Sequence, residues 1–130
     1  MTPRFIYKLV TDDEYRFPDF ARGSADDQRD GFIHFSTAEQ VQGTFEKYFA
    51  GRPRVSLLRA ETATLGDQLR WEPSRGGALF PHYYGELGAG VVLTKVASLP
   101  PSPEGGSILP RSWFRGDGLI DAGLAPLDKP

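Results

Sequence analysis

The sequence lacks cysteine, which excludes a disulfide scaffold, a thiolate zinc site and a cysteine nucleophile. It also lacks a basic excess: 15 Lys and Arg stand against 17 Asp and Glu, so we expect no general nucleic-acid binding. No apolar run approaches the roughly 20 residues of a membrane span, and no signal-peptide pattern opens the chain. We therefore expect a cytoplasmic protein without a membrane span. Neither common nucleotide loop, GxGxxG or GxxxxGK, is present.

The composition of the 130 residues, with 39% hydrophobic and 12% aromatic side chains, is typical of one compact domain. The composition changes near residue 100, where the run PPSPEGGS begins. We expect a single domain over residues 1–100 and a Pro/Gly-rich C-terminal tail over residues 101–130. The scattered apolar residues of this tail show no sustained period, so we expect it to be extended and to pack loosely on the domain or on a partner.

Alternating apolar residues predict short strands, and a capping box formed by Ser36 and Glu39 predicts a helix that ends near Phe49. Residues 21–30 are polar and are interpreted as a loop. The predicted strands cover residues 5–10, 31–35, 54–60, 69–73 and 91–99. Because strands outnumber helices, we predict an α+β fold with mostly antiparallel small sheets and two or three short helices.

His34 lies in the stretch DGFIHFST, where Ile33 and Phe35 would form a core face. The opposite face then carries His34 with Phe32 and Ser36, a half-apolar surface that is typical of the floor of a cleft. The alternative is an interior histidine whose ring nitrogens are satisfied by the backbone. The candidate site residues in the first part of the chain are therefore Tyr7 and Lys8, on the first predicted strand, and His34, Ser36 and Thr37.

The longest unusual stretch is RWEPSRGGALFPHYYGEL, residues 70–87. We expect His82 to leave a turn at Pro81, either within an aromatic cluster or as a second wall of the cleft with His34. Gly76 and Gly77 permit left-handed backbone angles, and with Arg75 they could hold an anion; the alternative is a tight turn with Arg75 paired on the surface. Trp71 and Tyr84 either belong to the core or stack on a planar ligand.

The two histidines do not have the spacing of metal ligands, so no metal site is predicted. Ser36 lies close to His34, but no nucleophile-elbow motif surrounds it.

The segments IYKL, DGFIHFST.EQV and WEPSRGG.LFPHYYG.L, in that order, resemble the DUF952 family of small bacterial and plant proteins over about residues 5 to 100. The resemblance implies a fold similar to the ADP-ribosyltransferases, with a cleft between two small sheets that binds NAD. It implies that Lys8 occupies the position of their first-strand His or Arg, and that His34, Ser36 and Thr37 lie on the strand of their second motif. The segment from His82 to Gly85 would lie near their third motif.

The sequence departs from that pattern at two points. Lys8 is a flexible point charge rather than an imidazole or a guanidinium. No glutamate has an obvious catalytic position; Glu72 and Glu86 are the candidates.

Our first hypothesis is therefore an ADP-ribosyltransferase-like enzyme or relic that binds NAD or another phosphate-bearing nucleotide metabolite, with ADP-ribosyl transfer or NAD glycohydrolase-like chemistry. Its expected catalytic residues are His34, His82 and Glu72. Its expected ligand-binding residues are Tyr7, Lys8, Ser36, Thr37, Trp71, Arg75, Gly76, Gly77 and Tyr84. The alternative is a non-catalytic module that binds a small anion or a peptide in the same cleft, and a third possibility is that both histidines are structural.

Overall fold

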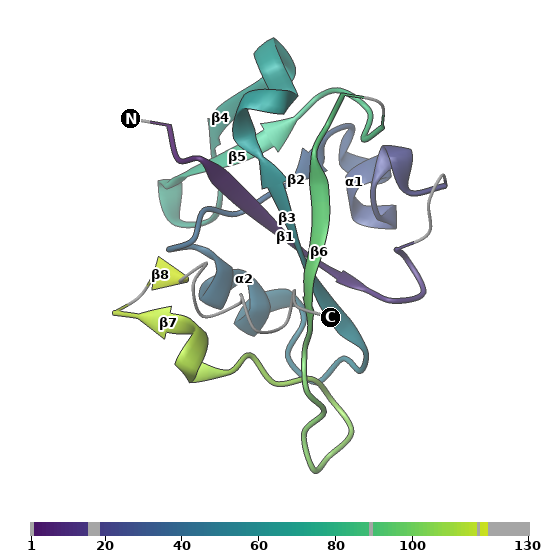
Figure 1. Cartoon of the computed structure of the whole chain (residues 1–130), viewed down its shortest axis with the longest axis vertical. Coiled ribbons are helices and arrows are strands. Elements are labelled where there is room, and N and C mark those ends of the chain that lie inside the picture. Colours follow the sequence, from purple (N-terminus) through teal and green to yellow (C-terminus); the bar gives the residue numbers. More distant parts are fainter. Residues whose placement is uncertain (1, 16–18, 89, 117, 120–130) are drawn as a thin grey trace.

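The computed structural model describes residues 2–15, 19–88, 90–116 and 118–119, except for the side chains of Asp19 and Arg75. These residues form three small antiparallel sheets and few helices, an α+β architecture as predicted (Figure 1). The first sheet has the order β1-β3-β6, with β1 at Phe5–Thr11, β3 at Val55–Glu61 and β6 at Leu93–Ser98. Its three strands agree with those predicted from the sequence at residues 5–10, 54–60 and 91–99.

The second sheet has the order β2-β5-β4, with β2 at Ile33–His34, β5 at Leu79–Tyr83 and β4 at Leu69–Pro73. An isolated bridge between Tyr7 and Ser36 joins the first sheet to the chain that follows β2. In this bridge each backbone N–H donates to the carbonyl of the other residue, at 2.8 and 2.7 Å. The two sheets are therefore tied together next to the residues that the sequence singles out.

Two short α-helices, α1 at Ala25–Asp30 and α2 at Val41–Tyr48, lie on opposite sides of β1 in Figure 1. Ser24 caps α1 in a reciprocal capping box with Asp27, and Gly31 ends the helix in the left-handed conformation, with φ at 84°. The 3₁₀ turns are η1 at Asp19–Arg22, η2 at Thr62–Gln68, η3 at Arg75–Gly77 and η4 at Arg111–Trp113.

Strand β1 separates two hydrophobic clusters because its side chains alternate between them. In the first cluster, Tyr7 and Leu9 pack with residues of α2 and with Leu57 of β3. In the second cluster, Ile6 and Val10 pack with Phe20, Ile33 and neighbouring residues. Lys8 lies on the second face yet is only 6% exposed, so a charged group is buried beside a hydrophobic cluster. A buried charge needs a partner, and the location of that partner decides the geometry of the site.

The described part of the C-terminal segment is not loosely packed. Trp113 is 7% exposed and joins Val41 and Phe45 in the first hydrophobic cluster. A short hairpin of β7 at Phe114–Arg115 and β8 at Gly118–Leu119 follows, and Leu119 is also buried there. The division of the chain near residue 100 stays a prediction, and residues 120–130 lie outside the described residues.

Three local expectations from the sequence are wrong. Residues 25–30 form α1 instead of a loop. The helix has no apolar stripe that would predict it, because its stability comes from its caps and from one buried carboxylate. Pro81 and His82 lie within β5, where the Pro81 carbonyl accepts from the Phe35 N–H at 3.0 Å, so no turn forms there. Ser36 does not cap α2, which begins after Gln40 without a side-chain cap.

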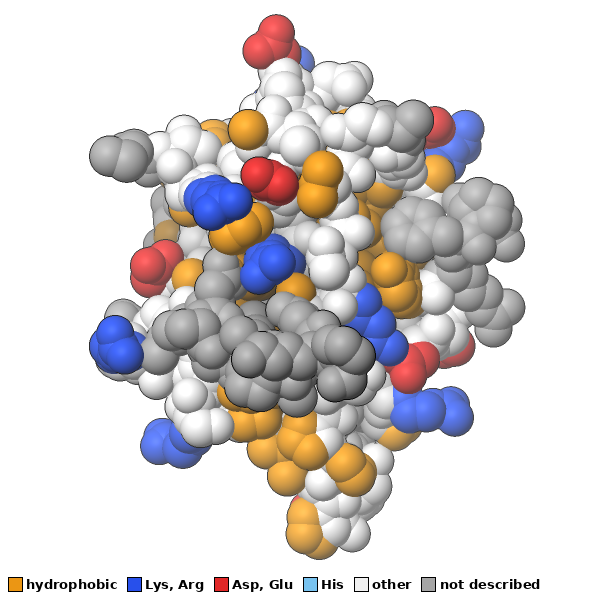
Figure 2. Space-filling model, in the orientation of Figure 1, with side chains coloured by type: hydrophobic (Ala, Val, Ile, Leu, Met, Phe, Trp, Pro, Cys, Tyr) orange, Lys and Arg blue, Asp and Glu red, His pale blue; other side chains and the backbone are white. Residues whose placement is uncertain are grey.

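The surface drawn in Figure 2 carries interspersed acidic and basic side chains. Over the described residues, no helix has the length and apolar character that crossing a membrane requires.

Candidate functional site

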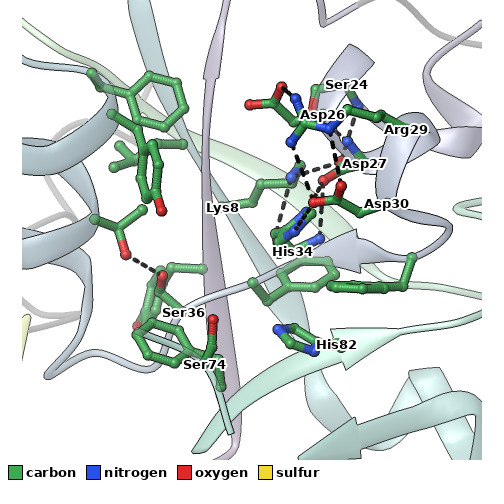
Figure 3. A pocket seen from close by; sticks show the side chains of 18 residues that line it. Lys8, Ser24, Asp26, Asp27, Arg29, Asp30, His34, Ser36, Ser74 and His82 are labelled. Carbon is green, nitrogen blue, oxygen red and sulfur yellow. Dashed lines mark hydrogen bonds and ion pairs between the residues drawn. The ribbon is translucent and has the colours of Figure 1, made fainter. Parts of the chain in front are cut away.

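A pocket of about 290 Å³ opens beside β1 and is lined by residues of α1, β2, α2 and β5. Figure 3 shows Lys8, Asp27, Asp30 and His34 gathered on one side of it, with Ser36 on the other side and His82 below. The pocket therefore combines a charged wall with a hydroxyl-bearing and aromatic wall.

The two histidines meet in this pocket because β2 and β5 pair in a register that places His34 opposite His82. Side chains of directly paired residues lie on the same face of an antiparallel sheet. The ring centroids are 5.7 Å apart, and Phe32 stacks on His82 at 4.1 Å and contacts His34 at 4.5 Å. Residues far apart in the sequence thus form one aromatic and imidazole surface.

Asp27 is the carboxylate that compensates the charge of Lys8. The Lys8 Nζ lies 2.8 Å from Asp27 Oδ2 and donates to the His34 carbonyl at 2.9 Å. The other carboxylate oxygen of Asp27 lies 2.6 Å from His34 Nδ1. Asp27 therefore links β1, α1 and β2, and its side chain is only 1% exposed.

Burial raises the pKa of the Asp27 carboxyl, but the Lys8 ammonium and the hydrogen bonds from His34 and Lys8 outweigh it and lower the pKa from 3.8 to about 2. Asp27 is consequently an anion at neutral pH, and the pair with Lys8 is a buried salt bridge.

The rim of the charged wall consists of Asp26, Arg29 and Asp30. The His34 Nε2 lies 3.0 Å from Asp30 Oδ2, and Arg29 contacts both Asp26 and Asp30 at 2.9 and 3.0 Å. The hydrogen bond from Arg29 lowers the pKa of the Asp30 carboxyl. Because the Asp30 side chain is 33% exposed, it is far more accessible than Asp27.

His82 has its own carboxylate partner. The His82 Nδ1 lies 2.8 Å from Glu72 Oε1, and the Tyr84 hydroxyl donates to the same oxygen at 2.7 Å. These hydrogen bonds, from His82 first and then Tyr84, lower the pKa of the Glu72 carboxyl. His82 is 5% exposed, so Glu72 holds a buried imidazole from outside the pocket.

The opposite wall of the pocket joins the chain after β2 to α2. The Ser36 and Thr44 hydroxyl oxygens are 2.9 Å apart and share a hydrogen bond. Tyr48 and Phe49 at the end of α2 add aromatic surface. This wall suits the hydroxyl groups and rings of a small ligand.

The structure places some of the predicted site residues in the pocket and others elsewhere. The pocket is lined by Tyr7, Lys8, His34, Ser36 and His82. Other described residues from the prediction do not line it: Thr37, Trp71, Glu72, Gly76, Gly77 and Tyr84. The side chain of Arg75 lies outside the described residues.

Each residue outside the lining has a local role. Trp71 packs against the second hydrophobic cluster, and the Thr37 N–H donates to Gln40 Oε1 at 3.0 Å. Gly76 and Gly77 have φ values of 70° and 82°, the left-handed angles that adjacent glycines permit. The turn at η3 therefore forms as predicted, although its glycines do not line the pocket.

Asp27, Arg29 and Asp30 line the pocket but are not among the residues predicted from the sequence, because the polar run 21–30 is typical of a loop. A local signal was available: Ser24 precedes Asp27 by three residues, and Gly31 follows Asp30. That pattern is an N-cap and C-cap pair for a helix of one to two turns. Within the described part of the chain, no group of three or more His, Asp or Glu residues could hold a metal ion.

Comparison with known proteins decides the family. A family model described as "Protein of unknown function (DUF952)" matches residues 8–95. The chain belongs to the DUF952 family. A comparison with curated proteins gives no match.

Solved structures of one bacterial protein, CC0527, are similar to this chain. The crystal structure of protein CC0527 from Caulobacter crescentus is 40% identical, with 80% of this chain and 93% of that chain covered and a TM-score of 0.65. The solution NMR structure of CC0527 is also 40% identical, with 81% and 92% covered and a TM-score of 0.62. The match to the family model confirms the family that the three sequence motifs indicate.

Proposed function

We propose that this DUF952 protein is an ADP-ribosyltransferase-like enzyme, or a relic of one, that binds NAD or a related nucleotide metabolite in the pocket beside β1. The observation that carries the proposal is the pair of imidazoles 5.7 Å apart in one pocket, each with Nδ1 beside a carboxylate. Paired carboxylate and histidine side chains are a common arrangement for proton transfer in enzymes.

The charged wall supports glycosidic chemistry. When the bond between nicotinamide and ribose breaks, positive charge develops on the sugar, and the nicotinamide leaves as a neutral ring. Asp30 supplies the accessible negative charge on that wall, whereas the charge of Asp27 is balanced by Lys8. An acceptor hydroxyl or water then forms the new C–O bond and releases its proton to His82 Nε2, which carries the lone pair when Nδ1 donates to Glu72.

The size of the pocket favours part of the nucleotide. Small-molecule pockets in proteins span about 300–1,000 Å³, and the volume here, about 290 Å³, is just below that range. We therefore propose that the ring and its ribose enter the pocket while the phosphates remain outside it. The ammonium of Lys8 is paired with Asp27, so Lys8 would act through that carboxylate rather than bind phosphate directly.

Nicotinamide release from NAD tests the enzymatic proposal. We expect the wild-type protein to release nicotinamide and the double variant His34→Ala, His82→Ala to lose at least 10²-fold in rate, the lower end of about 10²–10⁴ for general acid–base catalysis. Arg22→Ala is the matched control, because this side chain is 76% exposed and pairs only at the surface with Glu86 in the described structure. Equal rates in the wild type and the double variant would exclude catalysis by these histidines.

A second candidate is a non-catalytic module that uses the same pocket for a small ligand. The favouring observation is that all three carboxylates lining the pocket have cationic or imidazole partners: Asp26 with Arg29, Asp27 with Lys8, and Asp30 with Arg29 and His34. Binding of NAD or ADP-ribose that shifts the NMR signals of both imidazoles, without any product over days, would select this candidate.

A further inference from the structure

Among the described residues, the carboxylate of Asp27 has four polar neighbours. Oδ2 accepts from the Ser24 N–H at 2.9 Å and lies 2.8 Å from Lys8 Nζ. Oδ1 accepts from the His34 N–H at 3.1 Å and lies 2.6 Å from His34 Nδ1. Three of these four neighbours are obligate donors, namely two backbone N–H groups and an ammonium.

An ionised carboxylate has only acceptor sites, so it cannot donate to a ring nitrogen. The 2.6 Å contact between Asp27 and His34 is therefore a hydrogen bond only if His34 Nδ1 carries a proton, and the longer contact from Nε2 to Asp30, at 3.0 Å, is one only when Nε2 carries a proton as well. We infer that Asp27 is a positioning residue of the site: it fixes the ring orientation of His34 with a protonated Nδ1 and directs Nε2 toward the pocket.

The two carboxylates on His34 are not equivalent. Asp27 is 1% exposed and is held by groups from three elements, whereas Asp30 is 33% exposed and shares its carboxylate with Arg29. Nδ1 therefore has a fixed partner, and Nε2 has an exchangeable one. In this arrangement Asp30 occupies the position at Nε2 that an acceptor oxygen of a ligand takes when it enters, and Arg29 retains the released carboxylate.

The position of the proton on His34 in the free protein does not depend on the proposed function, so it is tested without a nucleotide. The imidazole nitrogens of His34 are assigned by long-range ¹H–¹⁵N NMR of uniformly labelled protein at neutral pH. In the wild type we expect a proton on Nδ1, with the chemical shift of a strongly hydrogen-bonded group and slow exchange with water. The variant Asp30→Asn must retain this Nδ1 signal and change only the Nε2 shift.

The variant Asp27→Asn keeps the size of the side chain but removes its charge. We expect it to lose the slowly exchanging Nδ1 proton and to give a mixture of His34 tautomers, while the signals of His82 stay in place. If this variant fails to fold, the wild type and Asp30→Asn still decide the matter. A wild-type His34 that is protonated on Nε2 alone, or an Nδ1 signal that disappears in Asp30→Asn, overturns the inference whether or not NAD binds.

Discussion

Replacement of Asp27 by Asn tests the buried ion pair that joins β1, α1 and β2. The substitution keeps the side-chain volume, removes the negative charge and leaves the Lys8 ammonium without its carboxylate in a site that is only 5% exposed. Breaking a buried pair from one side typically costs about 3–5 kcal/mol, because the remaining charge stays desolvated. We expect a loss of about 3 kcal/mol in the free energy of unfolding near neutral pH.

The pH dependence of this loss follows from the lowered pKa of Asp27. A folded-state pKa of about 2 against an ordinary value of 3.8 stabilises the folded protein at pH values above about 4. The stabilisation is lost as the pH falls through the folded-state pKa. A shift of about 1.8 units at about 1.36 kcal/mol per unit gives roughly 2 kcal/mol, so the difference between wild type and variant should narrow by that amount between about pH 6 and pH 2.

Urea unfolding followed by tryptophan fluorescence measures both effects, since Trp113 is buried and Trp71 is half-buried. Asp26→Asn is the matched control on the same helix: its side chain is 65% exposed, and surface pairs contribute about 0–1 kcal/mol. Our reasoning is wrong if Asp27→Asn is as mild as this control, or if its cost is the same at every pH.

Three further predictions follow from single contacts. Gly23→Ala should destabilise the protein more than Gly31→Ala. Both positions have φ near 84°, but only at Gly23 would the added methyl group meet the buried Asp27 carboxylate. Equal urea midpoints for the two variants would contradict the packing around α1. Tyr84→Phe removes a hydrogen bond to Glu72 and should raise the pKa of that carboxyl toward its ordinary value, as measured by ¹³C NMR. An unchanged pKa would show that the Tyr84 hydroxyl does not stabilise the Glu72 carboxylate. Trp113→Ala should cost about 3–5 kcal/mol in unfolding free energy, and a loss below about 1 kcal/mol would show that the C-terminal segment does not complete the core.

Much of the sheet structure could be predicted because strand alternation is a local property. The pattern in FIYKLV places Tyr7 and Leu9 on one face of β1 and Ile6 and Val10 on the other, as the structure has them. The same reasoning placed His34 opposite the core face that Ile33 forms. The prediction failed at β5, because a proline in a central strand removes a ladder donor and therefore argues against a strand.

The candidate site could be predicted only in part. Local alternation shows that Lys8 and His34 lie on particular faces, but a charged residue on a core-facing strand does not reveal its partner. Asp27 is 19 positions from Lys8, in a segment whose polar composition is typical of a loop. The sequence therefore supplied both histidines and Glu72, the partner of His82, but not Asp27, the carboxylate at Nδ1 of His34.

The sequence by itself determined the family, the strands with clear alternation and the absence of thiol chemistry, since these depend on residue identity and short-range order. Only the tertiary structure decided that His34 pairs with His82 across β2 and β5 and that Asp27 neutralises Lys8. The physical reason is that sheet register and the pairing of buried charges depend on contacts between segments far apart in the sequence. The local spacing of residue types carries no information about those contacts.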